Sequence, residues 1–63
     1  MTQKELLYLE DAISHEQIII KICNESLKSI EDENLVSFIE KEIEKHTSLK
    51  ELLMNKLEEK SNE

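Results

Sequence analysis

The sequence predicts an all-α fold in which two long helices form an antiparallel hairpin and two hairpins dimerise into a four-helix bundle. Three observations support this prediction. The 63-residue chain contains no Gly and no Pro, a composition typical of long helices and coiled coils rather than of sheets and their turns. Apolar residues recur alternately three and four positions apart in both halves of the chain, as on one face of a helix. Only a short polar segment separates the halves, so the helices must fold back on one another.

The first helix is predicted over about residues 3 to 30. Thr2 and Glu5 have the spacing of a capping box and mark its start. Its buried stripe is apolar apart from one carboxylate, and consists of Leu6, Leu9, Ile13, Glu16, Ile20, Cys23, Leu27 and Ile30. Glu16 stands at the centre of this stripe, where an unpaired carboxylate would be unfavourable. A partner for Glu16 is therefore expected.

The second helix is predicted over about residues 33 to 59, after a turn at 31–32. Asp32 is a favourable N-cap, and Glu33 complements the positive end of the helix. The buried face of this helix is expected to contain Leu35, Val36, Ile39, Ile43, His46, Leu53 and Leu57, with Leu49 and Met54 at its margins. Residues 60–63 are predicted to form a frayed tail, and residues 1–63 a single domain.

Two helices have too little mutual surface to cover stripes this wide, which favours a homodimer. The lone Cys23 excludes an internal disulfide, and no zinc-finger spacing is present, so self-association is the remaining way to stabilise so small a chain. A loose monomer or another oligomer is the alternative. The expected dimer interface consists of Leu6, Leu9, Ile13, Ile20, Leu27, Ile39, Ile43, Leu53 and Leu57.

The charge of the chain argues against two classes of partner. A net charge of −7 disfavours nucleic acids and anionic membranes, which bind through Lys and Arg. No apolar run is long enough to span a bilayer, and the N-terminus lacks the order of a signal peptide. These features predict an intracellular, soluble protein. No phosphate loop or nucleophile motif is present, which predicts that the chain is not an enzyme.

Three polar residues on the buried faces leave two interpretations open. Counting from the turn places Glu16 level with His46, and Glu42 lies one helical turn before His46. In the first interpretation, Glu16 and His46 form a buried ion pair that fixes the pairing of helices, and no cofactor is bound. In the second, two copies of Glu16, Glu42 and His46 bind iron, manganese or zinc. Ferritin-like carboxylate proteins use a similar set of ligands, in which Glu and His are three positions apart, as in Glu-x-x-His. In this sequence, Glu42 and His46 are four positions apart.

Three apolar residues are expected outside the buried stripes. Ile18 and Ile22 are one turn apart on helix 1, and Leu52 is on helix 2. They are predicted to form a second interface, for higher assembly or for a partner. The alternative is that they form a partly buried edge of a differently rotated bundle. Two remaining reactive side chains have ordinary expected roles, since His15 faces solvent and Cys23 packs at the edge of the stripe.

The segment "ENLVSFIEKEIEKHTSLKELL", read with "KELLYLEDAISHEQIIIKICNESLKS" before it, resembles the spore coat protein F family. The similarity lies in Leu35, in the acidic run that leads to His46, and in Glu51, Leu52 and Leu53, while the Gly-Trp-Tyr ending usual in the family is absent. The resemblance implies a ferritin-like helical hairpin with a structural role in the coat of bacterial spores. It highlights His46 and implies no catalytic residue. The alternative function is a small ferritin-like metal-binding protein, with metal-dependent oxidation as its only enzymatic possibility.

Overall fold

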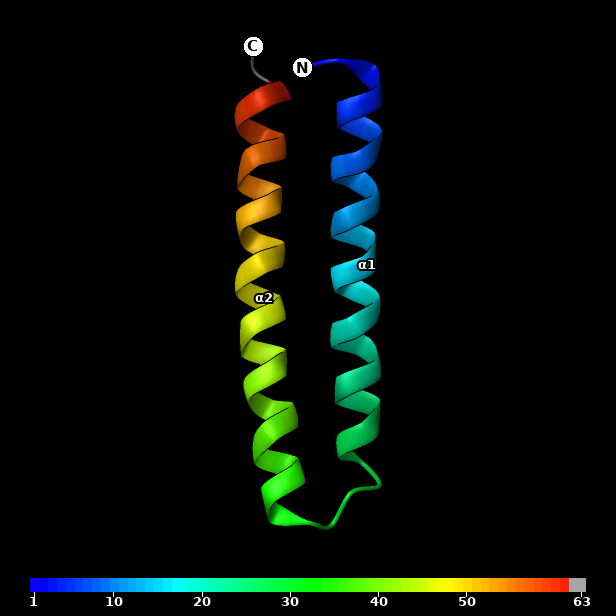
Figure 1. The fold of residues 1–63 in the computed structure, drawn as a ribbon, viewed down its shortest axis with the longest axis vertical. Helices are drawn as coiled ribbons and strands as arrows, with labels where there is room; N and C mark the ends of the chain where they lie inside the picture. Colours follow the sequence, from blue (N-terminus) through cyan, green and yellow to red (C-terminus); the bar gives the residue numbers. More distant parts are fainter. Residues whose placement is uncertain (62–63) are drawn as a thin grey trace.

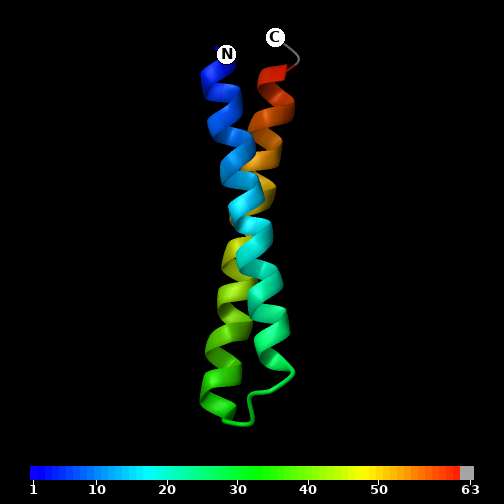
Figure 2. The same cartoon turned by 90° about the vertical axis from the view of Figure 1, so that its right-hand side faces the viewer.

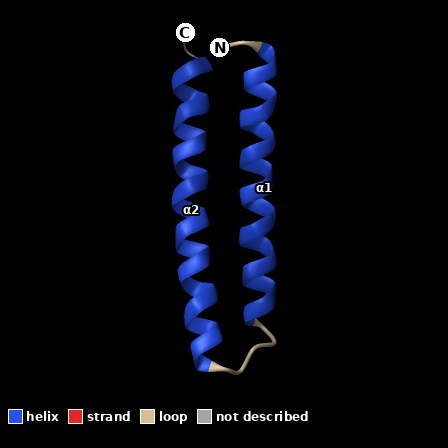
Figure 3. Ribbon diagram, in the orientation of Figure 1, coloured by secondary structure: helices blue, strands red, loops and turns tan. Residues whose placement is uncertain are grey.

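The chain folds as two α-helices packed in an antiparallel hairpin (Figure 1). The structure, a computed structural model, describes residues 1–61, with α1 at Gln3–Leu27 and α2 at Glu33–Ser61. The hairpin is a rod of 47 × 14 × 11 Å, and its two ribbons cross when it is viewed from the side (Figure 2). All regular structure in the described residues is helical (Figure 3). The predicted all-α hairpin is confirmed.

The start of α1 has the predicted capping box. The backbone N–H of Glu5 donates to the Thr2 hydroxyl at 3.1 Å, and the backbone N–H of Thr2 donates to the Glu5 carboxylate at 2.8 Å. These bonds satisfy two of the N–H groups that a helix start leaves unpaired. The hydrogen bonds from Thr2, first from its backbone N–H and then from its side chain, lower the pKa of Glu5.

The end of α1 differs from the prediction, because the helix stops at Leu27 rather than near residue 30. The backbone N–H groups of Lys28 and Ser29 donate to Glu25 and Ser26, at 3.2 and 3.1 Å, in the tighter pattern common at helix ends. The connection to α2 therefore consists of residues 28–32. Packed helices have axes about 8–10 Å apart, and the three extra residues give the chain the length to cross that distance and reverse.

The start of α2 is the predicted one, and its end lies further along the chain. The Asp32 carboxylate accepts the backbone N–H of Leu35 at 3.0 Å, as an N-cap does. The helix continues to Ser61, so Lys60 and Ser61 of the predicted frayed tail are helical, and residues 62–63 lie outside the described part of the chain. Glu and Lys are good helix formers, which favours this longer helix.

The core is a single seam between the two helices. Ile13 and Glu16 are its buried members, and no described side chain is fully buried. The nine residues of the expected dimer interface all lie in this seam, where the eight other than Ile13 are half-buried. The seam residues thus close the hairpin with part of their surface and leave the rest exposed at the open edges of the seam. Neither described helix has a stretch apolar and long enough to cross a lipid bilayer.

Candidate functional site

A polar cluster interrupts the seam at mid-height. A Glu16 carboxylate oxygen of α1 and His46 Nδ1 of α2 are in hydrogen-bonding contact. The other ring nitrogen of the same imidazole, Nε2, lies 3.5 Å from a Glu42 carboxylate oxygen. The predicted closeness of Glu16 and His46 is therefore confirmed, and Glu42 joins them through the i, i+4 spacing on α2.

Exposure rises across this cluster from the seam outward. The side chains of Glu16, His46 and Glu42 are 12%, 19% and 31% exposed. The imidazole lies between two carboxylates, so each of its nitrogens has an oxygen to pair with. Every buried side-chain nitrogen and oxygen among the described residues has a hydrogen-bond partner. This arrangement matches the ion-pair interpretation of Glu16, in which a specific partner accounts for a carboxylate in an apolar seam.

The geometry of the cluster also bears on metal binding. A carboxylate that holds one nitrogen of an imidazole orients the ring and leaves its other nitrogen to a ligand, and Glu16 has this position relative to His46. Within the described part of one chain, no three His, Cys, Asp or Glu residues are grouped so that they could hold a metal ion. The predicted metal site combined two copies of Glu16, Glu42 and His46, and it stays a prediction.

The remaining sequence candidates lie apart from this cluster. Cys23 is a free, half-buried thiol of the seam, and His15 is exposed. The members of the predicted second interface are all exposed on the surface of the single chain, at 53% for Ile18, 59% for Ile22 and 54% for Leu52.

A second row of apolar side chains runs along α2 and was not recognised as a unit from the sequence. We call it the α2 stripe, defined as Leu35, Phe38, Glu42, Lys45, Leu49 and Leu52. Its four apolar members are 46%, 59%, 38% and 54% exposed in that order. The exposure of Leu35 corrects its assignment to the buried face. Each member immediately precedes a seam position of α2, and that repeated offset is the sequence signal for the stripe.

The same offset occurs on α1. Tyr8, Ile19 and Ile22 each immediately precede a seam residue, with Tyr8 and Ile22 exposed and Ile19 half-buried. Because both helices are right-handed and antiparallel, the residues before the seam residues of α1 and of α2 project to the same side of the hairpin. One side of the rod therefore carries apolar side chains from both helices, interrupted at mid-height by His15 of α1 and by Glu42 and Lys45 of α2. The Lys4 ammonium lies 5.8 Å from the centre of the Tyr8 ring.

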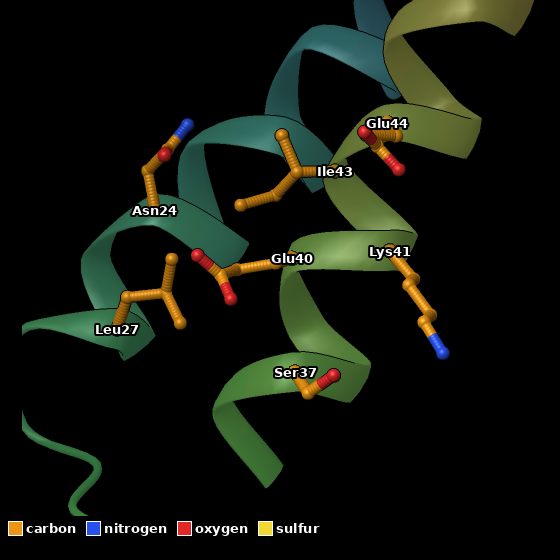
Figure 4. A pocket seen from close by; sticks show the side chains of 7 residues that line it. All are labelled: Asn24, Leu27, Ser37, Glu40, Lys41, Ile43 and Glu44. Atoms are coloured by element: carbon orange, nitrogen blue, oxygen red, sulfur yellow. The ribbon is translucent and has the colours of Figure 1, made fainter. Parts of the chain in front are cut away.

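The other side of the rod is polar near the turn. A groove of about 560 Å³ lies there between the helices (Figure 4). It is lined by the apolar Leu27 and Ile43 and by the polar or charged Asn24, Ser37, Glu40, Lys41 and Glu44. Glu40 extends toward α1 in this view. The groove is open to solvent and has charged groups of both signs, Glu40, Glu44 and Lys41, in its lining, so it lacks the enclosed apolar walls of a small-molecule site.

Together, the fold and the site define a small acidic helical hairpin that has one polar cluster in its seam and one apolar side. Comparisons of the sequence with protein-family models, with curated proteins and with solved structures found no match.

Proposed function

We propose that this chain is a non-enzymatic assembly module whose working form is a homodimeric four-helix bundle. The observation that carries the proposal is the surface that the single hairpin leaves open. A compact monomer of 7.4 kDa is expected to expose about 4,200 Å², whereas this chain exposes 5061 Å². The excess supports a partner that covers part of the rod.

The size of the excess is suited to a homodimer. It is about 850 Å², close to the roughly 800 Å² that each partner buries in a standard stable interface. The exposed apolar side chains on one side of the rod are the natural surface to bury, because apolar burial drives association. A second copy would also cover the open edges of the half-buried seam, including the nine residues of the expected interface.

The resemblance to the spore coat protein F family supports a structural role of this module in the coat of bacterial spores. A coat component must join many copies, and a dimer with apolar side chains left outside its interface would be suited to that. Ile18, Ile22 and Leu52 are the residues that we propose for contacts beyond a single hairpin. Under this proposal no cofactor is needed, and the polar cluster serves to specify the fold.

The first test of the proposal is the mass of the purified chain in solution. Sedimentation equilibrium and native mass spectrometry, over a hundredfold range of concentration, should give twice the 7.4 kDa chain mass. Helix content should fall together with the dimer on dilution, because the stability of the hairpin is coupled to association. A well-folded monomer at every concentration would contradict the proposal.

The alternative is a small ferritin-like metal-binding protein, and one contact favours it. Glu16 pairs with Nδ1 of His46 while Nε2 faces Glu42, so a dimer that brought two such sets together would offer nitrogen and oxygen ligands of the kind that zinc, iron and manganese accept. Elemental mass spectrometry after incubation with each metal and desalting tests this alternative. About one ion per chain, lost in Glu42→Ala and His46→Ala, would favour it over the assembly module.

A further inference from the structure

We infer that the two hairpins pair through their α2 stripes, antiparallel, with Glu42 of each chain opposite Lys45 of the other. This inference rests on the proposed homodimer and specifies which surface forms it and in which register. The occupant of the apolar side is thus a second copy of this chain. Three observations lead to it: the spacing of the stripe, the match of its members in one register, and the charges at its centre.

The spacing of the stripe is that of a coiled-coil seam. Its six members alternate three and four positions apart, and such a row stays on one side of a helix over its full length. Together, one step of three and one of four make a seven-residue repeat. In antiparallel pairing, residues at the first position of this repeat in one helix pack against residues at the fourth position in the other helix. Only a few registers satisfy this rule, so each can be judged by the side chains that it brings together.

One register matches every position. It places Leu35 opposite Leu52 of the second copy and Phe38 opposite Leu49, so that all four apolar side chains meet apolar partners. At the centre it places Glu42 opposite Lys45, twice by symmetry. A two-fold rotation maps this set of pairs onto itself, as an isologous homodimer interface requires.

The neighbouring registers, one repeat away on either side, fail at most positions. A shift in one direction places Leu35 opposite Lys45 and Phe38 opposite Glu42. A shift in the other places Glu42 opposite Leu52 and Lys45 opposite Leu49. Either shift would bury charges against apolar groups without a partner, which is strongly unfavourable. The register is therefore selected both by the favourable pairs that it forms and by the unfavourable pairs that the neighbouring registers would form.

The charges at the centre are free to form these pairs. Lys45 is exposed and has no ion-pair partner within the described part of its own chain, and Glu42 has one carboxylate oxygen directed at His46. Each chain has a net charge of −7, so two copies repel one another at long range. Two Glu–Lys pairs between chains would offset part of that repulsion at the point of closest approach.

The two sides of the rod also differ in the way that this inference requires. The exposed Tyr8 and Ile22 of α1 lie on the same side as the α2 stripe, and would extend the buried surface. The opposite side contains the open groove lined by Glu40, Glu44 and Lys41, whose charged side chains would lose water if a second copy covered them. Leu52 and Ile22 of the predicted second interface therefore belong to the dimer, and Ile18 is left for contacts between dimers.

Charge reversal of the central pair tests the register directly. Lys45→Glu should weaken the dimer at least about tenfold in Kd, because it replaces two attractive contacts by two repulsive ones. Glu42→Lys should weaken it similarly. A mixture of the two variants should form a heterodimer, since every central contact is then between opposite charges. The double variant should recover most of the affinity, although it still lacks the Glu42–His46 contact.

Lys21→Glu is the matched control, because it makes the same charge change at an exposed residue of α1 outside both rows. Sedimentation velocity and native mass spectrometry give the dimer populations, and circular dichroism confirms that each variant is helical. A wild-type dimer in which Lys45→Glu behaves like Lys21→Glu, or in which the two single variants do not prefer each other, would overturn the register and leave the proposed homodimer standing. A monomeric wild type would overturn both.

Discussion

Replacement of the Glu16–His46 pair by leucines tests whether the polar cluster specifies the fold or stabilises it. Glu16→Leu leaves the imidazole without its Nδ1 partner at a position only 19% exposed. An unpaired buried polar group costs about 1–3 kcal/mol, while burial of a leucine contributes about 1.5–3 kcal/mol. These effects nearly cancel, so Glu16→Leu should change the free energy of unfolding by less than about 1 kcal/mol.

The other single variant should behave differently, and so should the double variant. His46→Leu leaves the Glu16 carboxylate, 12% exposed, without its hydrogen-bond partner, and an unpaired carboxylate in the seam is the most costly outcome, at up to about 3–5 kcal/mol. In Glu16→Leu with His46→Leu, both polar groups are gone and two apolar side chains fill the seam. The double variant should be as stable as wild type or more stable, by up to about 4 kcal/mol.

The assay is urea unfolding of all four proteins at one fixed chain concentration, because the stability of a dimer depends on that concentration. The expected order is the double variant, then wild type close to Glu16→Leu, then His46→Leu. In thermal unfolding, each kcal/mol should move the Tm by about 4–8 °C in a chain this small. Glu51→Leu, at an exposed position of α2, is the control and should stay within about 0.5 kcal/mol.

Two results would refute this reasoning. Single effects that add, within about 0.5 kcal/mol, to the effect of the double variant would mean that the two groups are not coupled. A double variant that is less stable than either single one would mean that the pair stabilises the hairpin beyond what apolar packing could supply. A double variant that is stable but populates several oligomers would instead support a role in specifying one assembly.

Four further predictions concern the caps, the seam and the net charge. The Glu5 carboxyl should titrate in NMR below its ordinary pKa of 4.5. The stability that Glu5 contributes is therefore complete above its unfolded-state pKa and is lost as the pH falls through the lower folded-state pKa. Thr2→Ala should raise the titration midpoint of Glu5, and Thr2→Ser should not. Asp32→Ala should lower the free energy of unfolding by about 1 kcal/mol in urea, and Asp32→Ser should retain it. Ile13→Ala should cost about 2 kcal/mol in the same assay, whereas Leu7→Ala, at a residue 54% exposed, should have little effect. Raising the salt concentration from about 0.01 M to 0.15 M shortens the Debye length from about 30 Å to 8 Å and should strengthen the wild-type dimer in sedimentation equilibrium; a dimer that weakens would contradict a balance of charge dominated by repulsion.

The sequence predicted the parts of the fold that have local chemical signals. Thr2, Glu5 and Asp32 cap the helices as their side chains require, and the level of Glu16 with His46 followed from counting residues from the turn. The end of α1 was missed, since the chain has no Gly or Pro to mark it. The C-terminal end of α2 was missed because a segment rich in Glu and Lys is equally typical of a solvated tail and of an exposed helix.

The orientation of α2 about its axis was the harder feature to predict. Its apolar residues occupy two adjacent rows, which together form one wide apolar face. The sequence alone does not show which of the two rows packs against α1 to close the hairpin. Leu35 and Val36 are consecutive and both apolar, yet Val36 is half-buried and Leu35 is exposed. Phe38 has no place in a single buried stripe, and its 59% exposure becomes understandable only when the second row is recognised as a surface of its own.

The position of Glu16 in the seam has a counterpart in the proposed assembly. The Glu16–His46 contact lies at mid-height of the seam, and Glu42 and Lys45 lie beside it at the centre of the α2 stripe. The seam within each hairpin and the proposed interface between the two chains thus each have a polar layer in the middle and apolar layers above and below. A shift of either contact surface by one repeat would separate these polar partners and bury them against apolar side chains. In a uniformly apolar seam, the same shift would cost little. A carboxylate at the deepest point of α1 is therefore best understood as the residue that fixes the alignment of α1 with α2, as Lys45 is proposed to fix the alignment of one chain with the other.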